Sequence, residues 1–173
     1  MRFILTLAAL LLISAPAQAG AIFDFSFQNV TGNINGIVSG KITLSGTGDG
    51  TFSATSILVN AAPAGLGYTV PLDVLSVMPL VYVNTFVVSG GQIDKNLSSY
   101  ASENLSDAFT LNFGAFGSLL NIANSANAFS GVLDTTNFTL SYSTAAVPEP
   151  STAFALAAVC GVIGGLRRMR RSA

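Results

Sequence analysis

The sequence predicts an all-β domain, with an antiparallel β-sandwich or barrel-like fold, between two apolar segments at the ends of the chain. Three observations predict this class: apolar and polar residues alternate in short runs, glycine-rich segments separate the runs, and eight or more runs fit into about 128 residues, 20–147. Short strands at this spacing are typical of antiparallel sandwiches and barrels. The length suits one domain with its own core.

The strands are predicted from apolar residues at every second position. Residues 23–27, 41–45 and 138–143 show this pattern most clearly, and such strands bury one face and expose the other. The residues predicted to face the core are Phe23, Phe25, Phe27, Ile42, Leu44, Phe138, Leu140 and Tyr142. Further strands are predicted at residues 34–38, 55–60, 80–89, 109–113 and 118–122.

Two connections are predicted from glycine and proline. The dipeptide Asp49-Gly50 predicts a hairpin that pairs residues 42–44 with residues 51–53. Residues 61–79 contain three prolines, which cannot donate hydrogen bonds in a central strand. We therefore expect a long connection or an excursion at a sheet edge in this segment.

Residues 94–107 allow two interpretations. Leu97, Ala101 and Leu105 at four-residue spacing favour one short helix, whereas the serine and asparagine content also suits a loop. In a helix, Glu103 and Asp107 would share a face, and paired carboxylates can hydrolyse glycosides. Because the chain has no tryptophan to stack on a sugar, we favour two solvated carboxylates on a polar turn.

The N-terminus has the organisation of a secretory signal peptide. Arg2 precedes an apolar run over residues 3–13, and Ala17-Gln18-Ala19 supplies the small-x-small pattern that signal peptidase cleaves. Cleavage after Ala19 would make Gly20 the first mature residue, once the export translocon has moved the chain across the membrane. An uncleaved N-terminal anchor is the alternative.

The C-terminus combines an apolar run with a basic end. Residues 151–166 carry no charge, and they predict a single transmembrane helix, although a comfortable span needs about 20 residues. The four arginines that follow are Arg167, Arg168, Arg170 and Arg171. They would hold this end at the cytoplasmic surface by the positive-inside rule, and their stems can lengthen the span by snorkelling. A soluble basic tail is the alternative.

Immediately before the apolar run lie Val147, Pro148, Glu149, Pro150 and Ser151. This pentapeptide, the short helix and the arginine-rich end together resemble the PEP-CTERM sorting signal of Gram-negative bacteria. The resemblance implies a membrane-anchored precursor, exported across the inner membrane, that an exosortase cleaves near residues 148–150. The upstream domain would then reach the cell surface or the extracellular matrix. A proline-rich spacer before an anchor is the alternative interpretation.

These signals divide the chain into three parts. Residues 1–19 are predicted as the signal peptide, residues 20–144 as the β-rich exported domain, and residues 145–173 as a stalk with the sorting signal. Residues 20–147 contain two lysines and seven acidic residues, so their net charge is −5. A nucleic-acid partner is therefore not expected, because binding to phosphates requires clustered basic residues.

Several catalytic and metal-binding arrangements are excluded by composition. The chain has no histidine, and its one cysteine, Cys160, lies in the apolar tail, which excludes Ser-His-Asp, Cys-His and histidine–zinc sites. Neither Lys41 nor Lys95 lies in a Ser-x-x-Lys motif. Asp49, or Asp94 near Asn96, offers oxygen ligands for calcium, but without EF-hand spacing. We expect no cofactor.

Three functional hypotheses follow. The first is a non-enzymatic exported surface or matrix protein of a biofilm, associated with exopolysaccharide. The second is a glycan- or ice-binding module that uses a flat sheet face, although threonines are scattered and the aromatic platform is limited to the tyrosines. The tyrosines are Tyr68, Tyr82, Tyr100 and Tyr142. The third is a hydrolase. We favour the first hypothesis.

Overall fold

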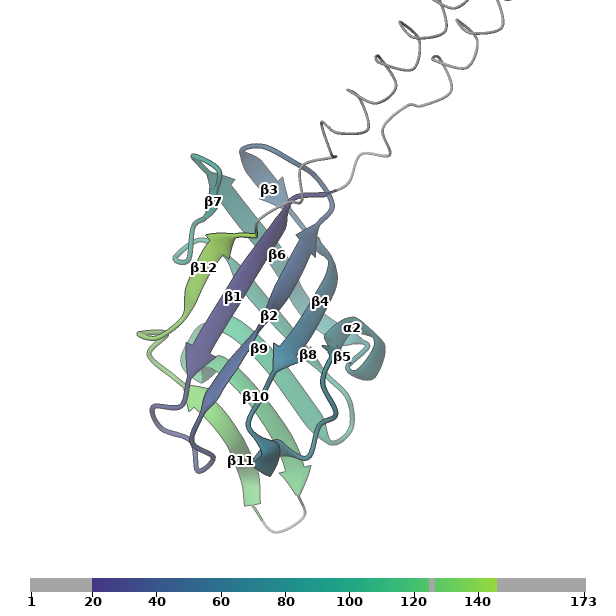
Figure 1. Ribbon diagram of the computed structural model, residues 1–173, viewed down its shortest axis with the longest axis vertical. Coiled ribbons are helices and arrows are strands. Elements are labelled where there is room, and N and C mark those ends of the chain that lie inside the picture. The colour runs from purple at the N-terminus through teal and green to yellow at the C-terminus, as the bar shows by residue number, and fades with distance from the viewer. Residues whose placement is uncertain (1–19, 125–126, 146–173) are drawn as a thin grey trace, which may run out of the picture.

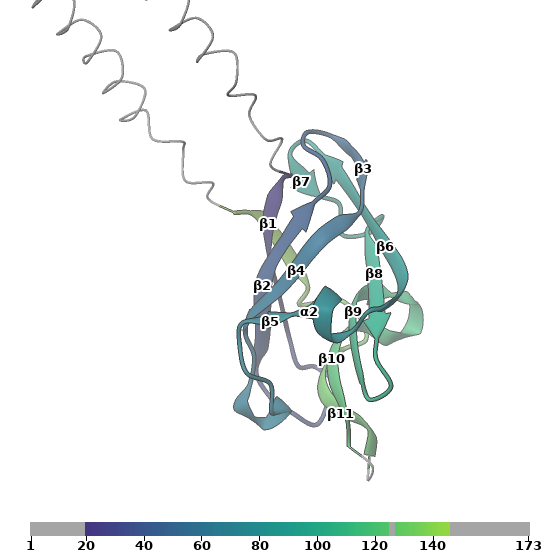
Figure 2. The same cartoon turned by 90° about the vertical axis from the view of Figure 1, so that its right-hand side faces the viewer.

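The computed structural model describes residues 20–124 and 127–145 as two antiparallel sheets (Figures 1 and 2). The five-stranded sheet contains β1 (Ile22–Gln28), β2 (Ile37–Leu44), β4 (Ala54–Ala61), β5 (Leu72–Asp73) and β12 (Ser141–Thr144). The seven-stranded sheet contains β3 (Gly50–Phe52), β6 (Leu80–Ser89), β7 (Gln92–Ile93), β8 (Ser99–Glu103), β9 (Asp107–Phe113), β10 (Gly117–Asn124) and β11 (Asn127–Asp134). Three short helices are η1 (Ala64–Leu66), α2 (Val74–Val77) and η2 (Gly114–Phe116).

The order of the strands confirms the predicted sandwich. The five-stranded sheet runs β12-β1-β2-β4-β5, and the other runs β11-β10-β9-β8-β6-β3 with β7 paired to β6. The two sheets lie face to face, as the view turned by 90° shows (Figure 2). Strand β12 returns from the second sheet to pair with β1, so the first and last strands of the domain are neighbours.

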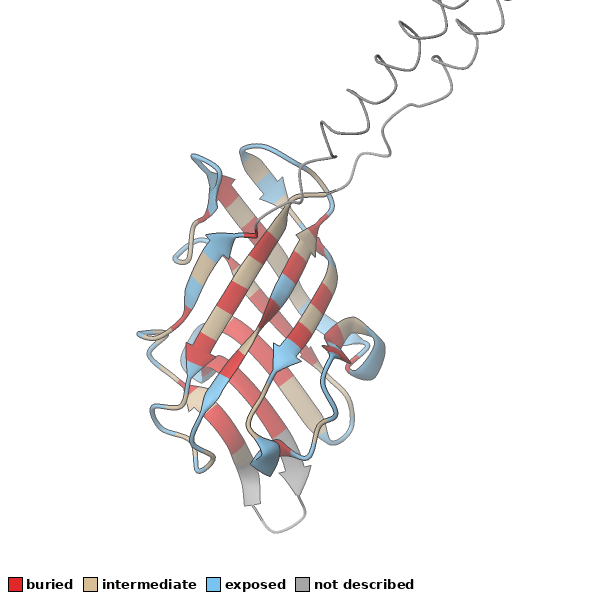
Figure 3. Cartoon of the chain, in the orientation of Figure 1, coloured by how far each residue is buried: buried red, intermediate tan, exposed pale blue. Residues whose placement is uncertain are grey.

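The core lies between the sheets, and in strands such as β1 and β2 it takes alternate residues (Figure 3). Phe23, Phe25 and Phe27 of β1 are buried, as predicted from their period-two spacing. Phe109 of β9 joins the two sheets, with its ring centroid 5.8 Å from that of Phe25 and 6.4 Å from that of Phe27. Aromatic side chains bury large apolar areas, so this cluster contributes much of the stability.

Most of the predicted strands are confirmed. Those at residues 55–60, 80–89, 109–113 and 118–122 are β4, β6, β9 and β10. The predicted strands at 34–38 and 41–45 form one strand, β2, which starts at Ile37 and continues through Gly40. A Cβ atom at Gly40 would lie 2.0 Å from the carbonyl oxygen of Leu58. Glycine is needed here because the backbones of β2 and β4 approach closely.

The predicted hairpin at Asp49-Gly50 is wrong. Strand β2 pairs with β4, whereas β3 belongs to the other sheet and pairs with β6. The carboxylate of Asp49 accepts hydrogen bonds from the backbone N–H groups of Gly90 and Gly91, both at 3.0 Å, in the turn after β6. These bonds hold the loop before β3 against the seven-stranded sheet, and local turn preference does not encode this tertiary contact.

Neither a helix nor a loop describes residues 99–103, because they form β8 between β6 and β9. Leu97 and Leu105, two residues of the proposed helix face, are 63% and 99% exposed. Ala101, the third residue of that face, is buried, but so are its neighbours Tyr100 and Ser102, as in a strand that is covered on both faces. Pairing on both sides outweighs the local preference of a serine- and asparagine-rich segment.

The prediction that Phe138 faces the core is also wrong, because its side chain is 86% exposed and precedes β12. The carboxylate of Asp134, at the end of β11, accepts hydrogen bonds from the backbone N–H groups of Phe138 at 3.2 Å and Thr139 at 2.7 Å. These bonds hold residues 135–139 in a turn. Leu140 is buried as predicted, and Tyr142 packs against the core.

The predicted long connection at residues 61–79 is confirmed. It contains η1, β5 and α2, and β5 pairs with β4 at the edge of the five-stranded sheet. Leu66, Val74 and Met78 of this segment are buried in the core. The connection therefore closes one side of the sandwich (Figure 2).

The loop between β1 and β2 covers the outer edge of β11. The backbone N–H groups of Val30 and Ile34 donate to the carbonyl oxygens of Leu133 and Gly131, at 2.8 and 3.1 Å. In return, the side-chain oxygen of Asn29 accepts from the N–H of Leu133 at 3.0 Å. Covered edges prevent a sheet from pairing with other chains.

We expect Asn29→Ala to lower the free energy of unfolding by about 2 kcal/mol, because the half-buried N–H of Leu133 loses its acceptor. Urea unfolding measures this loss, and hydrogen exchange of the Leu133 amide should become faster. Asn60→Ala, at an exposed position in β4, is the control and should change stability by less than about 0.5 kcal/mol. Unchanged exchange at Leu133 in Asn29→Ala would contradict this assignment of the edge.

Candidate functional site

The first and last described residues lie at the same end of the sandwich, which we call the attachment end. Phe23 of β1 is opposite Thr144 of β12, and the N–H of Ala145 donates to the carbonyl oxygen of Ile22 at 3.1 Å. The chain therefore enters the domain at Gly20 and leaves it at Ala145 through two adjacent antiparallel strands (Figure 1). Segments attached at either terminus of the domain share this end.

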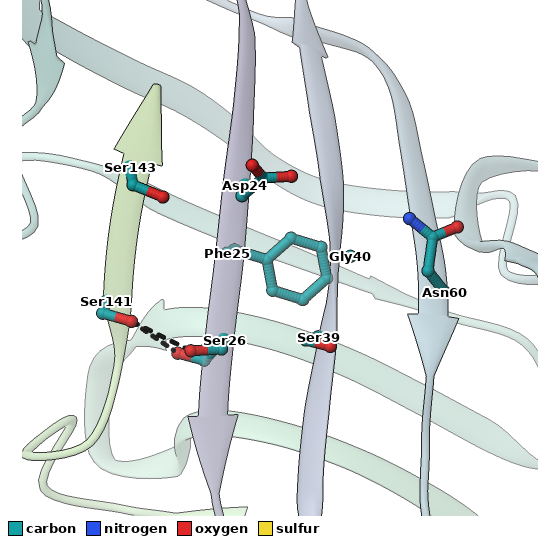
Figure 4. A pocket seen from close by; sticks show the side chains of 8 residues that line it. All are labelled: Asp24, Phe25, Ser26, Ser39, Gly40, Asn60, Ser141 and Ser143. Atoms are coloured by element: carbon teal, nitrogen blue, oxygen red, sulfur yellow. Dashed lines mark hydrogen bonds between the residues drawn. The ribbon is translucent and has the colours of Figure 1, made fainter. Parts of the chain in front are cut away.

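The outer face of the five-stranded sheet carries a polar depression of about 250 Å³ (Figure 4). Its side chains come from β12, β1, β2 and β4, and period-two alternation points them away from the core. The polar lining residues are Asp24, Ser26, Ser39, Asn60, Ser141 and Ser143. The hydroxyl groups of Ser26 and Ser141 are hydrogen bonded to each other at 2.9 Å.

The chemistry available beside this depression is limited. The Nζ atom of Lys41 lies 2.7 Å from Oδ1 of Asp24, and both side chains are nearly half exposed. The amine of Lys41 donates to this carboxylate and not to a serine of the depression, so the described residues show no Ser-Lys pair here. The depression offers hydroxyl, amide and carboxylate groups for hydrogen bonding to a polar surface.

A second depression, the aromatic groove, lies on the outer face of the seven-stranded sheet and has a volume of about 300 Å³. Its principal lining residues are Tyr82, Glu103, Thr110, Phe113, Phe116 and Leu119. The rings of Phe113 and Phe116 are stacked, with centroids 6.3 Å apart and planes inclined by 10°. The hydroxyl group of Tyr82 donates to the carboxylate of Glu103, and this bond raises the pKa of Tyr82 above its usual value.

The structure separates the two carboxylates that a helix would place together. Glu103 lies opposite Ala108 and lines the aromatic groove. Asp107 precedes Phe109 by two residues on β9, so it is on the same face of the strand as Phe109, which points into the core. The side chains of Glu103 and Asp107 therefore point to opposite faces of the seven-stranded sheet. Asp107 accepts a hydrogen bond from the amide of Asn104 at 3.3 Å instead. This arrangement does not provide the facing acid pair of a glycosidase.

The carboxylates considered as calcium ligands form hydrogen bonds within the fold. Bonds from Gly91 and Gly90 hold the pKa of Asp49 below its usual value. Asp94 accepts from the backbone N–H of Asn96 at 2.9 Å, which is a local turn. Across residues 20–124 and 127–145, no three side chains of the types His, Cys, Asp and Glu gather as a metal site would require.

The attachment end leads directly into the segment that the family comparison identifies. Residues 146–171 match the PEP-CTERM protein-sorting motif. The protein is therefore exported and sorted to the membrane or cell surface, with an exosortase as its processing partner. The resemblance inferred from the pentapeptide and the arginine-rich end is confirmed. The motif match does not include the β-sandwich.

Two other comparisons provide no relative for the sandwich. No curated protein matches the chain, and no solved structure matches it. The assignment of a role to this domain thus depends on its own residues.

The remaining predicted signals lie outside the described residues. These are the cleavage site at Ala17 and Ala19, the pentapeptide Val147 to Ser151, the apolar run 151–166 with Cys160, and the four arginines. In the part of the chain that the structure describes, no helix has the length and hydropathy to cross a membrane.

The aromatic groove is the feature that the sequence interpretation misses. Its signal is the pair Phe113 and Phe116, placed around Gly114 and followed by Gly117, both with positive φ. The predicted strands at 109–113 and 118–122 place Phe113 at a strand end and Phe116 in the turn between them. In the structure, the short helix η2 brings the two rings together. Glu103 of β8 and Tyr82 of β6 reach the same groove because β9, β8 and β6 are neighbours in the seven-stranded sheet.

Proposed function

We propose that this is a non-enzymatic surface or extracellular-matrix protein of a Gram-negative bacterium, cleaved by an exosortase near residues 148–150 and associated with exopolysaccharide. The observation that carries the proposal is the sorting motif at residues 146–171, immediately after the last strand of a complete sandwich. In this proposal residues 1–19 are the signal peptide, 20–144 the exported domain, and 145–173 the stalk and sorting signal.

The fold is compatible with removal of both ends. The last described backbone hydrogen bond of the domain joins Ala145 to Ile22, upstream of the proposed cleavage region. Cleavage after residue 148 therefore leaves the β1–β12 pairing and the core intact. Both ends of the described domain lie at the attachment end (Figure 1). In this proposal the outer faces and the opposite end are the surfaces that contact partners in the matrix.

Two observations support a non-enzymatic role. Lys41 is paired with Asp24 in the described domain, and the chain has no histidine, so the serines of the polar depression lack an activating base. Glu103 and Asp107 point to opposite faces of one sheet. A hydrolase would need a different arrangement of general acid and base.

The test is the double variant Pro148→Ala/Glu149→Ala in the native host, analysed by intact mass of the membrane and medium fractions. We expect the wild-type protein to start at Gly20 and end near residues 148–150, and the variant to stay in the membrane with its C-terminus at Ala173. Glu149, between two prolines, is the recognition element in this proposal.

The matched control is Asp73→Ala/Pro79→Ala, which exchanges an exposed acid and an exposed proline within the 61–79 connection. This control should be processed like the wild type. Normal processing of the motif variant would refute exosortase recognition of these residues. Retention of the wild type with Ala173 intact would instead make the protein a membrane-anchored domain.

Glycan binding is a second candidate function, and a specific observation favours it. The exposed Tyr82 and the stacked pair Phe113 and Phe116 provide an aromatic platform on one outer face. Aromatic platforms with a few polar groups are typical of small-molecule and glycan sites.

A further inference from the structure

The aromatic groove combines an apolar wall with a floor of small residues. Phe116 is 48% exposed, and its ring is stacked nearly parallel to that of Phe113, so the exposed part of the pair offers a flat aromatic surface. Ala101, Ala108 and the buried Leu119 lie in the same groove and keep it shallow. A flat apolar wall fits a ligand with a flat C–H surface, such as the face of a pyranose ring.

Polar groups lie beside the apolar wall. The carboxylate of Glu103 accepts from the hydroxyl of Tyr82, which restrains its orientation, and both residues line the groove. An ionised carboxylate offers about four acceptor sites, so Glu103 can accept further bonds from ligand hydroxyl groups. Hydrogen bonds to a charged acceptor are stronger than those between neutral groups.

The negative charge of the groove favours neutral ligands over anionic ones. Among the described residues that line it, none is a lysine or arginine, and Glu103 is negative. The exported domain carries a net charge of −5. Polyuronates, phosphates and fatty-acid carboxylates are therefore disfavoured, whereas a neutral ligand with many hydroxyl donors matches the acceptor.

The groove lies away from the attachment end. Val88 and Gly91 line a depression together with Gly20 and Ala145, which places the C-terminal end of β6 at the attachment end. Tyr82 precedes Val88 by six residues on the same strand, a distance of about 20 Å at roughly 3.3 Å per residue. The groove is therefore remote from the points at which the chain enters and leaves the described domain.

We propose that the aromatic groove binds a segment of a neutral polysaccharide, with pyranose faces on Phe113 and Phe116 and hydroxyl groups donated to Glu103. This inference depends on the proposed function, since export places the groove where polysaccharides occur. Its volume of about 300 Å³ is at the lower limit of ligand pockets and suits a short stretch of a longer chain.

The test uses the full chain in lipid nanodiscs, immobilised on a biosensor and exposed to dextran, galactomannan, mixed-linkage β-glucan and the polyuronate alginate. We expect binding to at least one neutral polysaccharide, weakened about tenfold in Phe116→Ala because a stacking surface is lost. Tyr82→Phe should weaken binding several-fold, because Glu103 is no longer oriented. Phe138→Ala removes an exposed phenylalanine elsewhere in the domain and should bind like the wild type.

Three results would overturn the proposal: no binding to any neutral probe, binding to alginate alone, or equal binding by Phe116→Ala and the wild type. Concentration-dependent self-association that Phe116→Ala abolishes would assign the groove to a second copy of the chain. Far-UV circular dichroism checks folding, and if Phe116→Ala does not fold, Glu103→Gln and Tyr82→Phe decide. Phe116→Ala should still be processed at its tail, so failure of glycan binding is distinguishable from failure of sorting.

Discussion

Phe109→Ala is expected to lower the free energy of unfolding by about 4 kcal/mol, the largest effect of any single change considered for this protein. Phe109 is fully buried, and its ring contacts Phe25 and Phe27 of the opposite sheet and Tyr100 of its own. The substitution removes a large apolar surface and leaves a cavity between the sheets. Domains of this size are stable by about 5–15 kcal/mol, so the loss is a large fraction of the total.

Urea unfolding followed by far-UV circular dichroism measures this effect. Phe138→Ala is the matched control, because it deletes the same side chain where it is 86% exposed. The control should change stability by less than about 0.5 kcal/mol. Equal effects of the two substitutions would contradict the position of Phe109 between the sheets.

Asp134→Asn is expected to lower the free energy of unfolding by about 3 kcal/mol. The buried Asp134 carboxylate accepts four hydrogen bonds, from the hydroxyls of Thr136 at 2.9 Å and Thr139 at 2.6 Å and from the N–H groups of Phe138 and Thr139. Thr139 in turn accepts from the N–H of Gln28 in β1 at 3.0 Å. An asparagine amide cannot accept at its nitrogen, so the turn that returns the chain to the five-stranded sheet would lose partners.

The pH dependence of this contribution has a defined sign. Burial raises the pKa of Asp134, but the hydrogen bonds from Thr139, Thr136 and Phe138 outweigh it and hold the pKa below the usual value. A lowered folded-state pKa contributes stability above the unfolded pKa of about 3.9, and this contribution is lost as pH falls through the folded pKa. The wild type should therefore exceed Asp134→Asn in stability at pH 7, with the difference shrinking in acid.

Unfolding at pH 7 and at pH 3 tests this expectation. Asp24→Asn is the control, because its pair with Lys41 is exposed and contributes at most about 1 kcal/mol. A difference between Asp134→Asn and the wild type that stays constant with pH would show that the charge of Asp134 is not what holds the turn.

Strand positions were predictable where each strand buries one face along its whole length. The three phenylalanines of β1 show this, since their spacing alone indicates a half-buried strand. Strand β8 was not predictable in this way, because Tyr100, Ala101 and Ser102 are consecutive buried residues of mixed polarity. Its state depends on pairing with β6 and β9 on its two sides, which the pattern of residues 99–103 does not contain.

Of the candidate sites, one was identifiable from local sequence and the other was not. The sorting signal is contiguous, and an enzyme reads it as a linear segment, so residues 146–171 were identifiable without any fold. The aromatic groove collects Tyr82, Glu103 and Phe116 from separate elements, so no local pattern contains it. The apparent carboxylate pair shows the reverse error, because Glu103 and Asp107 are close in sequence yet point to opposite faces of a sheet.

The sequence by itself determined the β-rich class, the acidic exported domain and the sorting signal at its end, because composition, period-two alternation and a linear motif are local properties. Only the tertiary structure decided that β3 and β12 change sheets, that Gly20 and Ala145 share one end, and that an aromatic groove forms on one outer face. These features depend on which strands pair. The carboxylates of Asp49 and Asp134 accept hydrogen bonds from backbone N–H groups in the turn after β6 and the turn before β12, and these bonds help to select that pairing.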